Sequence, residues 1–167
     1  MKKELMEMLN QAFDLCENGN FNEALSCYKE ILKKDPKNIN ALIDAGTTLQ
    51  NLGELKESIS YYDKALKINS KNLDALINKG SSLHSLGKFD DAISFYDKAL
   101  CVDNKCAIAL AYKGLSLGEL DKTHEALEYF KKALEIDREY DLAKLSKKIA
   151  QNILKSKLKG LSQSKRL

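Results

Sequence analysis

The residues best suited to chemistry are two histidines and four cysteines, and their spacing does not assemble a catalytic site. His84 and His124 have no carboxylate or thiol paired with both of them, so we interpret them as surface histidines without a catalytic role. The cysteines form no C-x-x-C pair, so no zinc or redox site is predicted and we expect free thiols. The chain also lacks G-x-x-x-x-G-K-[ST] and H-E-x-x-H motifs. We therefore expect no enzyme activity, no metal and no cofactor.

Composition and charge favour an ordered protein inside the cell. Apolar residues make up 44% of the chain and charged residues 31%, and no run of 18 or more apolar residues could cross a membrane. The N-terminal stretch MKKELMEMLNQAFDLCENGN has no unbroken apolar core, so we expect no export and a cytoplasmic location. Residues 141–167 carry eight Lys or Arg and one Asp, whereas the rest carries 19 basic and 23 acidic residues. This basic end is either a solvated face or a contact for nucleic acid or an acidic partner.

A pattern of 34 residues organises the chain. It is clearest at 73–106, LDALINKGSSLHSLGKFDDAISFYDKALCVDNKC, where Gly80 aligns with Gly46 and Gly114 and Tyr96 with an aromatic residue in every copy. A fixed period of this length is typical of a repeat array. We place the repeats at 5–38, 39–72, 73–106 and 107–140.

Each repeat is predicted to be a pair of helices. In the third repeat, apolar or small residues recur at steps of three and four before and after a break at Gly87. Glycine tolerates the left-handed backbone that ends a helix, and Gly19, Gly53 and Asp121 hold the same place in the other repeats. The small residue at the eighth position, such as Gly46, predicts a close approach of the two helices with a small residue opposite, which is Ser58 in the second repeat. A buried aromatic ring is expected to fill the next layer.

After residue 140 the period stops, and a capping helix is predicted at 141–159. Leu142, Leu145, Ile149 and Ile153 form a stripe that we expect to close the apolar face of the last repeat, with lysines on the outer side. Gly160 is expected to end this helix. Residues 161–167 are predicted to be a frayed basic tail, so that a single array covers residues 1–160.

The repeated glycines, the A-x-x-x-aromatic pairs such as Ala92 and Tyr96, and the alanines at 65, 99 and 133 resemble the tetratricopeptide repeat family. The likeness covers residues 5–140. Leucines stand where this family often has Trp, and Lys79 and Lys113 replace its Leu. The resemblance implies an all-α, right-handed solenoid of antiparallel helix pairs, here four repeats plus the capping helix. It also implies a non-catalytic scaffold that binds a peptide or a helix of a protein partner.

In this family the first helix of each repeat lines a concave groove. Carrying those positions over implies a groove that is polar in the middle and apolar at its ends, formed by Ile43, Asp44, Thr47, Ile77, Asn78, Ser81, His84, Ala111, Tyr112 and Leu115. One subfamily grips an acidic C-terminal tail with cations at fixed positions. Asp44 and Asp74 stand where two of those cations would be needed, so we expect no such binding and a neutral or basic ligand.

Met6, Leu9 and Phe13, continued by Cys16, repeat at steps of three and four on a face that the core does not need. This apolar patch either packs on preceding residues, forms a surface for self-association, or anchors a partner helix. As an alternative function, the basic C-terminal helix could contact nucleic acid or a ribonucleoprotein, and steep weakening by salt would distinguish that contact from peptide binding.

Overall fold

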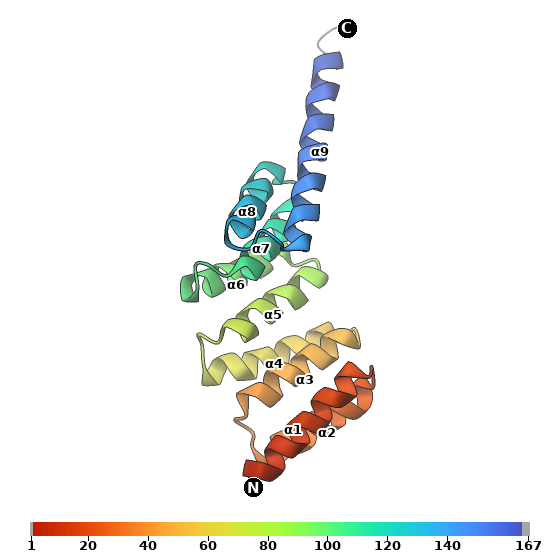
Figure 1. Cartoon of the computed structure of the whole chain (residues 1–167), viewed down its shortest axis with the longest axis vertical. Helices are drawn as coiled ribbons and strands as arrows, with labels where there is room; N and C mark the ends of the chain where they lie inside the picture. Colours follow the sequence, from red (N-terminus) through yellow and green to blue (C-terminus); the bar gives the residue numbers. More distant parts are fainter. Residues whose placement is uncertain (1, 165–167) are drawn as a thin grey trace. The chain divides into compact units, whose positions relative to one another are not determined.

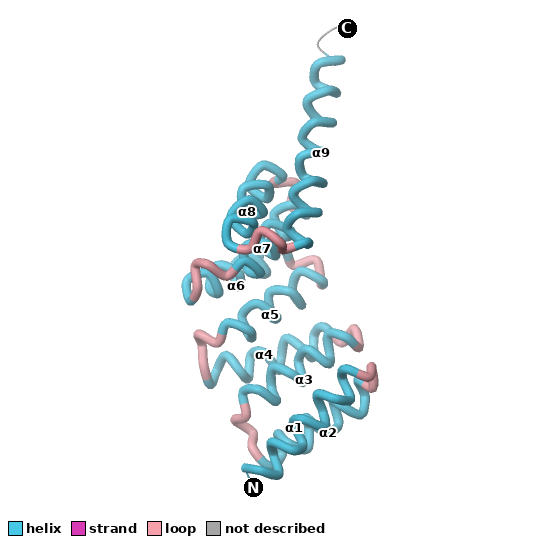
Figure 2. The backbone as a smooth tube through the Cα atoms, viewed as in Figure 1, coloured by secondary structure: helices cyan, strands magenta, loops and turns pink. Residues whose placement is uncertain are grey.

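The computed structural model describes the backbone of residues 2–164 and the side chains of residues 3–156. Within these ranges every regular element is a helix, and short turns join one helix to the next (Figures 1 and 2). The helices are α1 (Lys2–Glu17), α2 (Phe21–Lys34), α3 (Ile39–Asn51), α4 (Leu55–Ile68), α5 (Leu73–Ser85), α6 (Phe89–Val102), α7 (Ala107–Glu119), α8 (Thr123–Ile136) and α9 (Asp141–Ser164). None of the helices in the described part of the chain has the length and apolar character that a membrane crossing requires.

The chain divides into two compact units, which we call the N-terminal unit (Met1–Gly87) and the C-terminal unit (Lys88–Leu167). In the N-terminal unit each of the helices α1 to α5 packs on the next, and α3 also contacts α5. In the C-terminal unit α6 to α9 pack in the same way, and α7 also contacts α9. The division falls at Gly87, between the two helices predicted for the third repeat. The single array over residues 1–160 stays a prediction.

The turns inside the helix pairs have the predicted backbone. Gly19, Gly53 and Gly87 have φ angles of 76°, 80° and 72°, and Asp121 has a φ of 59°. In the second of these turns the Gly53 N–H donates to the Gln50 carbonyl (3.0 Å), which satisfies a carbonyl at the end of α3. The sequence therefore located the sharp reversal in every pair, including the one where an aspartate replaces glycine.

The eighth-position glycines allow close packing, but against rings rather than against small residues. A Cβ atom on Gly46 would lie 2.5 Å from Tyr62 Cε1, and one on Gly114 would lie 2.6 Å from Phe130 Cε1. The expected opposite residue in the second repeat, Ser58, instead shares a buried hydrogen bond of 2.8 Å with Ser82 of the following repeat. The glycine and the aromatic ring thus form one layer.

The lysines that depart from the family pattern also have a structural role. Lys79 Nζ donates to Asp63 Oδ1 and Lys113 Nζ to Asp97 Oδ1, both at 2.5 Å and each across 16 residues. Only 13% and 12% of the two lysine side chains is exposed. Each pair joins the second helix of one repeat to the first helix of the next, where a leucine would otherwise pack.

Helix α9 differs from the predicted cap in length and in its packing face. It runs to Ser164, so Gly160 does not end it and residues 161–164 are helical, while 165–167 lie outside the described residues. The face against the last repeat consists of Ala143, Ser146 and Ala150, at most 8% exposed. Small side chains let two helices approach closely, so the larger residues of the predicted stripe lie beside the contact. Leu145, Ile149 and Ile153 are 59%, 50% and 41% exposed.

Candidate functional site

The first part of the predicted groove is the face of α3 and α5 in the N-terminal unit. Ile43 and Ile77 are only 8% and 7% exposed, so they form the floor of this face and do not offer a ligand an apolar ladder. Asp44 and Asn78 are half-buried beside them, and Thr47 is exposed. Burial raises the pKa of the Asp44 carboxyl, and the nearby charge of Asp74 raises that pKa further.

Hydrogen bonds already occupy part of this polar face. The Tyr62 hydroxyl donates to Gln50 Oε1 at 2.6 Å, and Gln50 Nε2 donates to the backbone carbonyl of Asn78 at 3.4 Å. Thr47 Oγ1 donates to the Ile43 carbonyl at 3.1 Å and lies 3.3 Å from the Tyr62 hydroxyl. These bonds fix α3 against α4 and α5. The side chains of Asn78 and Ser81 remain half-exposed at the surface.

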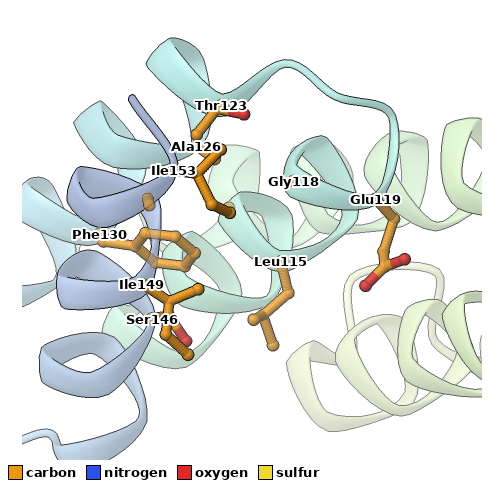
Figure 3. Close-up of a pocket in the computed structure, with 11 residues that line it drawn as sticks. Leu115, Gly118, Glu119, Thr123, Ala126, Phe130, Ser146, Ile149 and Ile153 are labelled. Atoms are coloured by element: carbon orange, nitrogen blue, oxygen red, sulfur yellow. The ribbon is translucent and has the colours of Figure 1, made fainter. Parts of the chain in front are cut away.

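The C-terminal unit has an open, mainly apolar pocket of about 250 Å³ between α7, α8 and α9, which we call the α7–α9 cleft. Figure 3 shows Leu115, Phe130, Ile149 and Ile153 directed into this space from the three helices. The full lining consists of Gly114, Leu115, Gly118, Glu119, Thr123, Ala126, Phe130, Ser146, Ile149, Ala150 and Ile153. Most of these groups are apolar, which suits an apolar side chain of a ligand.

The other predicted groove residues differ in how far they are exposed and in the unit to which they belong. Ala111 is fully buried and cannot contact a ligand. Tyr112 is half-buried, with its ring 5.9 Å from the ring of Tyr96. His84 is half-buried in α5, in the N-terminal unit. Of the residues predicted for the last repeat, Leu115 alone therefore lines the cleft.

Sequence reasoning missed the contribution of α9 to this cleft. Ile149 and Ile153 were assigned to the capping contact, but they line the cavity and remain about half exposed. A signal was present in the repeat register, because Ile149 stands 34 residues after Leu115. The same register places it at a groove position of a further first helix.

The predicted N-terminal patch is smaller than expected. Met6 and Phe13 are 59% and 58% exposed, so they could contact a partner. Leu9 and Cys16 pack against the core of the N-terminal unit, and Cys16 Sγ lies 3.3 Å from Thr48 Oγ1. All four cysteines are free thiols in the structure.

Comparisons with known proteins agree with this architecture. Residues 17–99 match a family model described as anaphase-promoting complex, cyclosome, subunit 3, and residues 107–140 match one described as tetratricopeptide repeat. No match is found among curated proteins.

Solved structures share the fold at low sequence identity. PilF of Pseudomonas aeruginosa has a TM-score of 0.84 at 21% identity, over 93% of this chain and 71% of that one. MamA of Desulfovibrio magneticus RS-1 has a TM-score of 0.74 at 22% identity, over 96% of both chains. The first tetratricopeptide repeat domain of Spaghetti (RPAP3), bound to an HSP90 peptide, has a TM-score of 0.68 at 22% identity, over 72% of this chain and 95% of that one.

These likenesses confirm the predicted fold class, an all-α solenoid of antiparallel helix pairs. The number of repeats stays a prediction, because the two compact units divide the third helix pair. The repeated glycine and aromatic layer, the helix pairs and both family models lead to one conclusion: the chain belongs to the tetratricopeptide repeat family.

Proposed function

We propose that this protein is a non-catalytic scaffold that binds a peptide or a helix of a partner protein, with an apolar side chain of the partner in the α7–α9 cleft. The observation that carries this proposal is the cavity of about 250 Å³ with Ile149 and Ile153 half exposed at its edge. Pockets for drug-sized ligands usually measure about 300–1,000 Å³, so this one suits a side chain better than a cofactor. Covering the exposed isoleucines would supply hydrophobic free energy for binding.

The α3–α5 face of the N-terminal unit is proposed as a second, polar contact. Asn78 and Ser81 can exchange hydrogen bonds with a peptide, while Asp44 and Asp74 place negative charge on the same face. An acidic tail would be repelled there, so a neutral or basic segment is expected. Replacing Asn78 with alanine should weaken the binding of such a segment by about 1 kcal/mol if its amide bonds the ligand backbone.

Nucleic-acid binding by α9 has weaker support. Lys144 already pairs with Glu139 at 2.6 Å and with Asp141 at 3.7 Å, and Lys147 is half-buried. In the part of α9 whose side chains are described, this leaves Lys148 and Lys155 as exposed lysines without an ion pair. Two such charges are few for tracking a phosphate backbone, and the other basic residues of this end, Lys157, Lys159, Lys165 and Arg166, lie outside the described side chains.

A displayed peptide library selected against the whole protein tests the main proposal. Recovered peptides should carry apolar residues at steps of three and four, and they should lose binding to Ile149→Glu. The control is Gln151→Glu, which adds the same charge to an exposed position of the same helix and should leave binding unchanged. Peptides that bind wild type and Ile149→Glu equally would place the site elsewhere. Binding of a nucleic acid to the protein that weakens by several orders of magnitude between low and moderate salt would favour the nucleic-acid alternative.

A further inference from the structure

Among the described side chains, α1 and α9 are the helices that carry more than one exposed large apolar residue, whereas Ile68, Val102, Ile108 and Ile136 stand singly on their helices. On α1 these are Met6 and Phe13, 59% and 58% exposed. On α9 these are Leu145, Ile149 and Ile153, 59%, 50% and 41% exposed, which we call the α9 stripe. Met6 and Phe13 lie seven residues apart, and the α9 stripe has steps of four, so each set lies along one side of its helix. Each helix therefore presents a narrow strip for a further helix.

The charged residues beside the two strips have opposite signs. On α1, Glu7 directly follows Met6 and Asp14 directly follows Phe13, and both carboxylates are exposed. On α9, Lys144 directly precedes Leu145 and Lys148 directly precedes Ile149. Each residue along a helix is rotated by about 100° from the one before it. The acids of α1 therefore flank Met6 and Phe13, the α1 strip, on the side reached by going one residue forward. The lysines of α9 flank the α9 stripe on the opposite side, the one reached by going one residue back.

Nearby ion pairs partly neutralise these charges but do not change the sign of either flank. Lys3 Nζ lies 3.9 Å from Glu7 Oε1, with both side chains well exposed, and Lys144 pairs with Glu139 and Asp141. Asp14 and Glu17 on α1 and Lys148 and Lys155 on α9 are all exposed and take part in no ion pair within the described side chains. The flank of α1 is therefore acidic, and the flank of α9 is basic.

We propose that α1 of one copy of this protein binds the α9 stripe of a second copy, with the two helices parallel. When parallel helices pack face to face, the side after the strip of one lies against the side before the strip of the other. This arrangement brings Asp14 near the lysines of α9 while Phe13 covers the isoleucines and approaches the α7–α9 cleft. The inference rests on the proposed function of that cleft, and it names the occupant.

A contact between two α1 helices, or between two α9 helices, of different copies lacks this pairing of opposite charges. An antiparallel pair of α1 helices brings carboxylates against carboxylates, and an antiparallel pair of α9 helices brings lysines against lysines. The pairing is therefore heterologous: each copy has one donor helix and one acceptor helix. Such contacts lead to chains or rings of copies, whereas a self-complementary contact stops at a dimer.

Sedimentation velocity of the whole chain over a range of concentrations tests this assembly. Wild type should associate as its concentration rises, whereas Phe13→Glu alone and Ile149→Glu alone should stay monomeric. Their mixture should form a one-to-one dimer, because the first variant keeps an intact α9 stripe and the second keeps an intact α1. Gln11→Glu and Gln151→Glu add the same charge to exposed positions of the same helices and should associate like wild type.

A charge exchange tests the orientation of the contact. Asp14→Lys should raise the dissociation constant about two- to fivefold, as expected for an exposed ion pair, and adding Lys148→Glu should restore it. Far-ultraviolet circular dichroism should show unchanged helix content for every variant.

Several outcomes would overturn the assembly. These are a wild-type chain that stays monomeric at millimolar concentration, a variant mixture that does not pair, or single variants that associate as well as wild type. If wild type is monomeric but selected peptides still bind through Ile149, the proposed function stands and the second copy is the wrong occupant. If the peptides also fail, both proposals fail.

Discussion

Gly114 is the position in α7 where the addition of one methyl group should do the most harm. A Cβ atom there would lie 2.6 Å from Phe130 Cε1 and 2.9 Å from Phe130 Cδ1, whereas carbon atoms in contact normally lie about 3.5–4.0 Å apart. The Phe130 ring is 3% exposed and packs with Leu117, Ala126 and Ala150. It cannot move away without displacing α8 or α9.

The expected magnitude follows from two opposed effects. Alanine favours a helix over glycine by about 1 kcal/mol, which would stabilise Gly114→Ala. Overpacking a core typically costs about 1–3 kcal/mol, and a contact roughly 1 Å too short belongs near the upper end of that range. We therefore expect Gly114→Ala to lower the free energy of unfolding by about 1–2 kcal/mol. Gly118→Ala, one turn later with no atom within 4 Å of the added carbon, should raise it by up to about 1 kcal/mol.

Urea and thermal unfolding of both variants would measure these effects. A change of 1 kcal/mol should shift the Tm by about 2–4 °C in a chain of this size. The double variant Gly114→Ala/Phe130→Leu should lose less stability than the sum of its single changes, because the smaller side chain makes room for the methyl group. A Gly114→Ala protein as stable as Gly118→Ala would show that the two helices do not approach as closely as described.

Three further changes test other parts of the fold. Gly53→Ala should cost about 1–2 kcal/mol in urea unfolding, because the residue has a φ of 80°, and no loss would contradict the left-handed turn. Ser58→Ala should cost about 1 kcal/mol by removing the buried bond to Ser82, and Ser82→Ala in addition should recover most of it; simple additivity would argue against the bond. Burial, aided by the charge of Asp74, raises the pKa of Asp44 above its usual 3.8. The stability of the wild-type protein therefore falls as the pH rises from the pKa of Asp44 in the unfolded chain to its higher pKa in the folded protein. Asp44→Asn should therefore be more stable than wild type at pH 7 and lose this advantage below about pH 4, and equal stability at both pH values would contradict the burial.

The features that sequence predicted well are those fixed by local geometry. Asp121 shows this clearly, since it was placed at a left-handed turn only because it aligns with Gly19, Gly53 and Gly87, and its φ is 59°. A tight reversal between helices permits few backbone conformations, so the residue type reports it directly. The family and the helix pairs follow from the same kind of signal.

The features that sequence predicted poorly depend on how helices approach one another. Ile43 and Ile77 occupy groove positions of the family, but their burial is set by how closely α3 and α5 pack with their neighbours. The aromatic partner of Gly46 was assigned to the next layer for the same reason. Periodicity says which residues share a face of a helix, but it does not say how deep that face lies.

Helix α9 shows which rule decides between two candidate faces. Leu145 and Ile149 are the larger apolar residues, and hydrophobicity alone would bury them, but Ala143 and Ala150 are buried in their place. The repeat register explains the choice, because position 143 lies one period after a series of fully buried alanines. These are Ala41, Ala75 and Ala109.

The helix thus packs as the first helix of a further repeat would pack, using the small residues that this position requires. The buried face of α9 is therefore already satisfied without its large apolar residues. Burying Leu, Ile or a similar side chain is worth about 1.5–3 kcal/mol, so the exposed α9 stripe leaves several kcal/mol of hydrophobic free energy unused in the isolated chain. Association with a partner would recover that free energy, which is why the α9 stripe rather than the polar α3–α5 face is where binding should begin.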